Sequence, residues 1–297
     1  MCVDIPWQPD TCEWRDWAGE RLLLAHGVCS CDEGKVIGLA GRRDGFVGVF
    51  DSGVGGISVL RSLVEELPHE DFRFFGDSAN APYGEKTEGQ VLELSCGIVK
   101  RFVDEGAKAI VIACNTATSV AAPTLRAAYP DVPIVGIEPA LKPAARALPH
   151  GRILVMATEV TLRLEKYHEL VRAWGGECEV VPVPCPGLAA RIERGGLDAP
   201  DVLEMLGRYV GAHAGHVDGV VLGCTHYPFV RRQIAEVLGP DVRFFDGGAG
   251  TARQLGARLA DTGLLADRDR SGRVEFASSL DTPEELALYE RFFSLSC

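Results

Sequence analysis

The chain has 297 residues, which is enough for about two globular domains with a large hydrophobic core that needs no disulfide bonds. Hydrophobic residues make up 46% and charged residues 24%, a composition typical of a soluble globular protein. The 42 acidic and 30 basic residues give a net charge of −12, which argues against general binding to nucleic acid or to an anionic membrane. No apolar run is long enough to span a membrane, and Met1–Asp10 lacks the basic start of a signal peptide, so we expect a cytoplasmic protein.

Residues 1–45 differ in composition from the rest of the chain. They hold three of the four tryptophans and four of the ten cysteines, and their one apolar cluster is Leu22–Ala25. We expect residues 1–45 to form an N-terminal extension that is disordered in part.

From Phe46 onward, short apolar runs alternate with segments of helical periodicity. Eight runs have the length and the Val, Ile and Phe content of buried parallel strands: Phe46–Phe50, Phe72–Phe75, Ala109–Ala113, Pro133–Ile137, Ile153–Ala157, Glu179–Val183, Gly219–Gly223 and Val242–Phe245. Between the second and third runs, Thr87 and Gln90 form the pattern of a capping box at a helix start. This alternation predicts an α/β fold with mainly parallel sheets, whose ligands gather at the carboxyl ends of the strands.

Two of the predicted strands end in similar sequences. The run Lys108–Ala113 is followed by Cys114, Asn115 and Thr116, and the run Asp218–Gly223 by Cys224, Thr225 and His226. The two cysteines are 224 − 114 = 110 residues apart. We expect two pseudo-symmetric α/β domains that each present one thiol to a cleft between them.

The cysteines allow several kinds of chemistry. In a large chain without a signal sequence, a reducing compartment is more plausible than a disulfide framework. A zinc site needs clustered ligands, and the spacing of Cys29 and Cys31 is too short for the usual pair, so we expect no metal. A thiol hydrolase could use Cys224 with His226, but this would leave Cys114 unexplained.

A racemase that works without a cofactor uses both thiols. It must remove a proton from one face of a carbon and return one to the other face, and the two enantiomers have equal free energies. Two acid/base groups of the same kind are therefore needed, and a thiol with a pKa of about 8.5 can serve in either protonation state. An α-amino acid substrate carries a carboxylate and an ammonium group. The carboxylate suits Asn115, Thr116, Thr225 and Ser52, and the ammonium group suits Asp51 or another carboxylate in the cleft. The glycine-rich turn at Gly53–Gly56 lacks both nucleotide-binding spacings, so no nucleotide cofactor is indicated.

Six segments carry a family resemblance. They are Phe50–Gly56, Phe75–Ser78, Pro82–Gly84, Ala113–Ala117, Gly136–Ala140 and Leu222–Pro228. In order and approximate spacing they resemble the motifs of the bacterial glutamate racemase family, and the resemblance runs from about Phe46 to Gly263. It implies two interleaved domains, the first formed by residues 46–138 and 241–297 and the second by residues 139–240.

The resemblance also implies an activity and a role for each matching residue. The family makes D-glutamate for peptidoglycan without pyridoxal phosphate or metal, commonly as a homodimer. Cys114 would act on D-glutamate with help from Asp51, and Cys224 on L-glutamate with help from His226. The matching substrate-binding residues are Ser52, Pro82, Tyr83, Gly84, Asn115, Thr116, Thr158 and Thr225, and the supporting carboxylates are Asp77 and Glu193.

One departure from the family pattern lies near the predicted site, since Asn80 stands where the family usually has arginine. Two alternatives stay open. One is an enzyme of the wider superfamily that acts on aspartate, a hydantoin or maleate. The other is a non-catalytic regulator that has kept the pocket and binds a protein partner.

Overall fold

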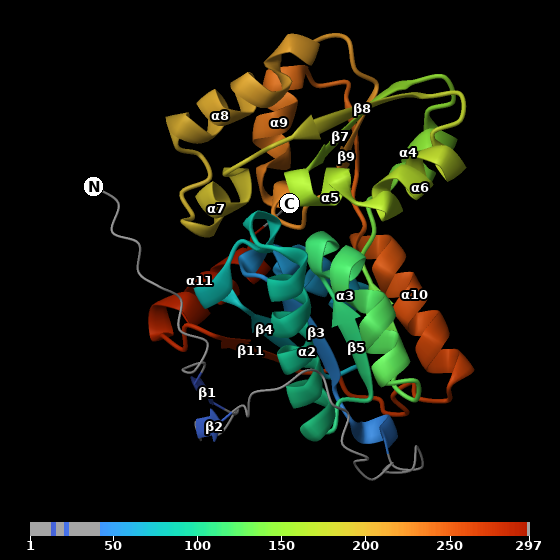
Figure 1. Cartoon of the computed structure of the whole chain (residues 1–297), viewed down its shortest axis with the longest axis vertical. Helices are drawn as coiled ribbons and strands as arrows, with labels where there is room; N and C mark the ends of the chain where they lie inside the picture. Colours follow the sequence, from blue (N-terminus) through green and yellow to red (C-terminus); the bar gives the residue numbers. More distant parts are fainter. Residues whose placement is uncertain (1–12, 16–20, 24–41, 296–297) are drawn as a thin grey trace. The chain divides into compact units, whose positions relative to one another are not determined.

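The computed structural model describes residues 13–15, 21–23 and 42–295 (Figure 1). Contacts divide the chain into two compact units, residues 1–37 and residues 38–297. In the first unit, β1 (Glu13–Arg15) pairs antiparallel with β2 (Arg21–Leu23). The rest of the predicted extension up to residue 41, with its four cysteines, lies outside the described residues.

The second unit contains two parallel sheets. The first has five strands in the order β11-β4-β3-β5-β6, and every neighbouring pair is parallel. Its strands are β3 (Val47–Asp51), β4 (Phe72–Gly76), β5 (Ala109–Ile112), β6 (Ile134–Gly136) and β11 (Val274–Ser278). The sequence pattern predicted four of these strands, and β11 is an addition at the edge beside β4.

The second sheet has four parallel strands in the order β10-β9-β7-β8. They are β7 (Arg152–Ala157), β8 (Glu179–Pro184), β9 (Gly219–Leu222) and β10 (Arg243–Phe245). The predicted α/β class with mainly parallel sheets is confirmed. Strand β10 pairs with β9, so the second sheet continues to Phe245.

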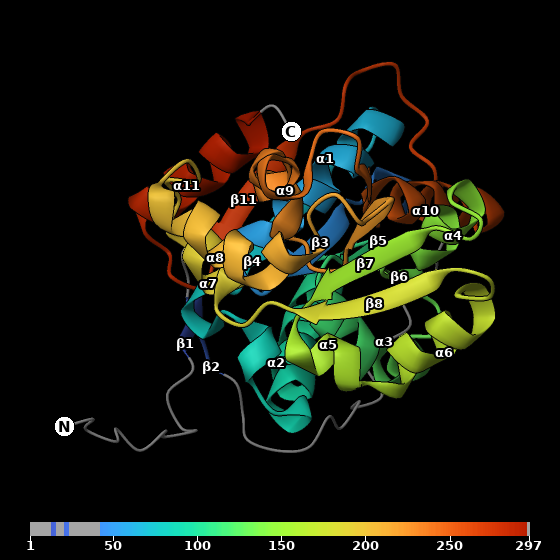
Figure 2. The ribbon, with the colours of Figure 1, turned by 90° about the horizontal axis from the view of Figure 1, so that it is seen from above.

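Helices cover both faces of the first sheet. Figure 2 shows α2 and α3 on one side of the strands and α1, α10 and α11 on the other. These helices are α1 (Ile57–Glu66), α2 (Glu88–Asp104), α3 (Asn115–Ala128), α10 (Gly248–Asp261) and α11 (Pro283–Ser294). In the described segments, no helix is both long and apolar enough to cross a membrane.

The second sheet is also buried on both faces, as the alternation of its side chains requires. Ile153 and Val155 of β7 pack with α4 and α6, whereas Leu154 and Met156 belong to the main core that includes α8 and α9. The helices of this half are α4 (Leu141–Ala147), α5 (Glu159–Arg163), α6 (Glu165–Trp174), α7 (Leu188–Glu193), α8 (Pro200–Val210) and α9 (Arg231–Leu238).

The predicted capping box at Thr87 is confirmed, and a proline stands at the start of a second, shorter helix. The hydroxyl of Thr87 accepts from the backbone N–H of Gln90, and the Gln90 side chain accepts from the backbone N–H of Thr87, which completes the capping box of α2. Pro228 lies at the start of η7 (Tyr227–Val230), the short 3₁₀ helix after Cys224, where its missing N–H removes no helical hydrogen bond.

Candidate active site

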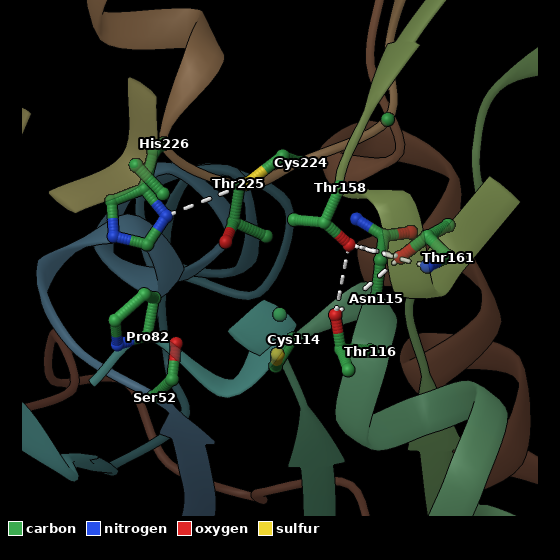
Figure 3. Close-up of a pocket in the computed structure, with 13 residues that line it drawn as sticks. Ser52, Pro82, Cys114, Asn115, Thr116, Thr158, Thr161, Cys224, Thr225 and His226 are labelled. Atoms are coloured by element: carbon green, nitrogen blue, oxygen red, sulfur yellow. Dashed lines mark hydrogen bonds between the residues drawn. The ribbon is translucent and has the colours of Figure 1, made fainter. Parts of the chain in front are cut away.

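A pocket lies where the carboxyl ends of strands from the two sheets meet (Figure 3). The residues lining it are Ser52, Pro82, Gly84, Cys114, Asn115, Thr116, Thr158, Thr161, Ala189, Gly223, Cys224, Thr225 and His226. The free volume between its lining side chains is about 20 Å³, which is enough for about one water molecule. The predicted residues Asp51, Tyr83, Asp77 and Glu193 lie behind this lining.

Cys114 lies at the junction of β5 and α3. It is the N-cap residue of α3, and its Sγ accepts the backbone N–H of Ala117 at 3.4 Å. This bond and the helix N-terminus favour a thiolate, as in other reactive cysteines. Burial nevertheless raises the pKa of the Cys114 thiol well above its ordinary value, and the negative charge of Asp51 adds to the effect. Burial therefore favours the neutral thiol of Cys114.

Asp51, at the end of β3, is the charged group that acts most strongly on Cys114. The carboxylate is fully buried and accepts three hydrogen bonds, from the Ser52 backbone N–H at 2.6 Å, the Ser52 hydroxyl at 3.3 Å and the Thr225 hydroxyl at 2.8 Å. Burial raises the pKa of Asp51, while the charge of His226 and the bonds from Thr225 and Ser52 act in the opposite direction. Because Thr225 follows β9, this bond joins the two sheets at the site.

Cys224, His226 and Glu193 form a second group on the opposite wall. The Sγ of Cys224 lies 3.5 Å from Nδ1 of His226, and Nε2 of His226 lies 2.5 Å from Oε1 of Glu193. Burial alone would lower the pKa of His226, but the Glu193 carboxylate and Cys224 outweigh it and the pKa is raised well above its ordinary value. The raised pKa favours the protonated form of His226, which lies between a carboxylate and a thiol. Glu193 also accepts the backbone N–H of Val54 from the first sheet at 3.1 Å.

A third group supports the loop after β4. The hydroxyl of Tyr83 donates to Oδ2 of Asp77 at 2.6 Å, and Nδ2 of Asn80 donates to Oδ1 at 2.9 Å. Burial raises the pKa of Asp77, and these bonds oppose the rise. Asn80, at the position where the resemblance predicts arginine, thus gives Asp77 a neutral amide as partner. The loop carries Pro82 and Gly84 to the edge of the pocket.

Polar groups without charge complete the lining. Both amide atoms of Asn115 are buried and have no hydrogen-bond partner, so this side chain can donate and accept in the pocket. The hydroxyls of Thr116, Thr158 and Thr161 lie 3.0–3.4 Å from one another. The sequence pattern did not single out Thr161 as a site residue. Its distance of three residues from Thr158, which caps α5, is the signal that could have found it.

The remaining described cysteines stay outside the lining. All five cysteines that the structure describes are free, and Cys96, Cys178 and Cys185 do not line the pocket. Among the described residues, no three His, Cys, Asp or Glu side chains are grouped so that they could hold a metal ion. The two thiols of the pocket thus come from equivalent positions, the ends of β5 and β9.

Comparison with known proteins decides the family. A model of the Asp/Glu/Hydantoin racemase family matches residues 47–255. The chain belongs to this family. It is therefore a racemase, an enzyme of the isomerase class.

Individual relatives within the family extend the likeness over most of the chain. A glutamate racemase from Clostridium perfringens is 44% identical over 250 residues, which are 84% of this chain and 96% of that protein. A glutamate racemase from Bifidobacterium adolescentis is 48% identical over 246 residues, 81% of this chain and 94% of the relative. A crystal structure of glutamate racemase from Francisella tularensis in complex with D-glutamate has a TM-score of 0.75 and 27% identity, and the match covers 86% of this chain and 95% of that one.

Proposed function

We propose that this racemase interconverts L- and D-glutamate by a two-base transfer between Cys114 and Cys224, without cofactor or metal. The observation that carries the proposal is that both thiols line one small pocket from the ends of strands in different sheets. The thiolate of Cys114 takes the α-proton of D-glutamate while the thiol of Cys224 gives a proton to the opposite face, which yields L-glutamate. The reverse reaction exchanges the two roles.

Each thiol has a partner suited to its task. Asp51 accepts the proton of the buried Cys114 thiol, because a carboxylate whose pKa is raised by burial is a stronger base than an exposed one. His226, kept protonated by Glu193, lies beside the sulfur of Cys224 and stabilises a thiolate there or returns a proton to it. The two halves of the site thus share a thiol that transfers the proton and differ in the side chain that assists it.

Substrate binding relies on neutral groups and helix geometry. No lysine or arginine is among the described residues lining the pocket. We assign the two carboxylates of glutamate to the Thr116 hydroxyl, to the Asn115 amide and to the free N–H groups at the start of α3. The hydroxyls of Ser52 and Thr225 donate to Asp51 in this structure, and we propose that they turn to the substrate when it binds. Because the free volume of the pocket is far smaller than glutamate, we propose that the lining side chains move apart when the substrate binds.

The finer points of function rest on the relatives. Their names support glutamate over aspartate, and D-glutamate is the product that peptidoglycan synthesis would consume. Two reduced thiols are needed for the reaction, which fits a reducing cytoplasm. We also propose a homodimer, which sedimentation of the purified protein tests directly.

Circular dichroism tests the substrate. The purified protein is incubated with each enantiomer of glutamate and of aspartate, with no cofactor and with a metal chelator present. We expect both enantiomers of glutamate to reach the racemic mixture and aspartate to stay unchanged. Turnover of aspartate but not of glutamate would identify an aspartate racemase instead, and turnover of neither would favour a binding protein.

A further inference from the structure

The C-terminal helix α11 packs behind the pocket and contacts elements that carry site residues. It contacts η3 (Val54–Gly56) and α1, and it follows the edge strand β11 of the first sheet. Tyr289, near the middle of α11, has no exposed surface, and its ring packs edge-on against Phe74 with centroids 5.5 Å apart. The family model ends at residue 255, so this helix lies outside the matched segment.

The hydroxyl of Tyr289 joins α11 to the loop after β4. It donates to the Ser278 hydroxyl at 3.1 Å and lies 2.7 Å from the Ser78 hydroxyl, so that Ser78 can donate to it. A Cβ atom at Gly76 would lie only 2.0 Å from the same oxygen. The end of β4 therefore packs directly on the Tyr289 hydroxyl, and a glycine is required there for close approach.

The loop itself connects the Tyr289 hydroxyl to the pocket. Ser78 follows Asp77, whose carboxylate accepts from Tyr83 at 2.6 Å. The backbone N–H of Ala79 donates to the Ser279 hydroxyl at 2.9 Å, which joins the same loop to the end of β11. The neighbours of Tyr83 on either side, Pro82 and Gly84, line the pocket.

The same helix also supports the opposite wall. The ring of Phe292 packs edge-on against Phe229 with centroids 4.7 Å apart, and Phe229 belongs to η7, which follows His226. A Cβ atom at Gly195 would lie 2.7 Å from the guanidinium of Arg291, and Gly195 is two residues beyond Glu193. Helix α11 therefore packs against chain segments from both walls of the pocket.

We propose that Tyr289 is a positioning residue whose hydroxyl holds the loop of residues 77–84 in the geometry that binds substrate; this rests on the proposed glutamate racemase function. Without the hydroxyl, the loop loses its hydrogen bond to α11, while the bond from Ala79 to Ser279 still joins it to the end of β11. Cys114 and Cys224 are held by β5 with α3 and by β9, so the proton transfers themselves keep their geometry. The loss falls on substrate binding, which changes KM and leaves kcat nearly unchanged.

The variant Tyr289→Phe tests the proposal, because it removes one oxygen and keeps the ring. We expect KM to rise about 5- to 10-fold for both enantiomers, with kcat within about 2-fold of the wild type. We also expect faster amide hydrogen exchange in residues 77–84. The matched control is Phe293→Leu on the same helix. The ring of Phe293 packs against Phe276 of β11 and makes none of the hydrogen bonds that hold the loop.

Phe293→Leu should lower the melting temperature while leaving KM and the exchange of residues 77–84 as in the wild type. If Tyr289→Phe leaves the amide hydrogen exchange of residues 77–84 unchanged, the positioning role is overturned, whatever the substrate is. An equal effect of both variants would overturn it too, because Tyr289 would then act only through the stability of α11. Failure of the wild type to racemise glutamate would refute the proposed function, and the exchange measurement would still decide the role of Tyr289.

Discussion

Replacing Thr225 by valine removes the hydroxyl that joins Asp51 to the opposite sheet and keeps the shape of the side chain. The Thr225 hydroxyl donates to the buried Asp51 carboxylate at 2.8 Å. This bond favours the charged form of Asp51, so its loss raises the pKa of Asp51 further. A hydrogen bond to a charged group contributes about 1.5–3 kcal/mol, and about 1.4 kcal/mol corresponds to one pH unit. We expect the acid limb of the kcat/KM profile to move up by about one to two pH units.

The assay is racemisation followed by circular dichroism across pH, starting from each enantiomer. Because the equilibrium constant of a racemisation is one, kcat/KM must be the same in both directions, which checks each data set internally. Thr225→Ser keeps the donor and should keep the acid limb of the wild type. An unmoved acid limb in Thr225→Val, or an equal shift in Thr225→Ser, would refute the role of Asp51 as the base that receives the proton of Cys114.

Two further substitutions test the opposite wall and the core. Glu193→Gln removes the charge that raises the pKa of His226. The basic limb of the kcat/KM profile, measured by circular dichroism, should therefore move to lower pH. A basic limb that stays in place would contradict the role of His226 as a cation. Lys108→Met breaks a fully buried ion pair with Glu70 (Nζ–Oε2 2.5 Å) and should lower the free energy of unfolding in urea by about 3–5 kcal/mol, whereas adding Glu70→Leu should restore most of it. A loss below about 1 kcal/mol in the single variant would show that Glu70 finds another partner.

The sequence predicted those parts of the fold and site that depend on local patterns. Buried runs of Val, Ile and Phe identified eight strands to within one or two residues. The polar residues that come after Cys114 in the chain indicated its position between β5 and the start of a helix. Such features depend on residues that are close in the chain, so periodicity and capping patterns reveal them.

Features that depend on distant contacts were beyond this kind of prediction. The strand β11 has the short sequence Val274–Ser278 and is fixed by its parallel pairing with β4, some 200 residues away. The pairing of β10 with β9 also joins a short edge strand to a partner that is set by tertiary packing. The bond from Thr225 to Asp51 and the contact of Tyr289 with Ser78 likewise join segments that no local pattern relates.

Deuterium incorporation with the two cysteine variants tests the central claim most directly. The wild type, Cys114→Ala and Cys224→Ala are each incubated with L- or D-glutamate in deuterated water without cofactor, and inversion and α-deuterium are followed together. Our account predicts that the wild type inverts glutamate with one α-deuterium in the product, and that each variant loses at least about 100-fold in the rate of inversion. A variant that racemises within about tenfold of the wild type, or a product that keeps its original α-proton, would contradict the two-thiol mechanism.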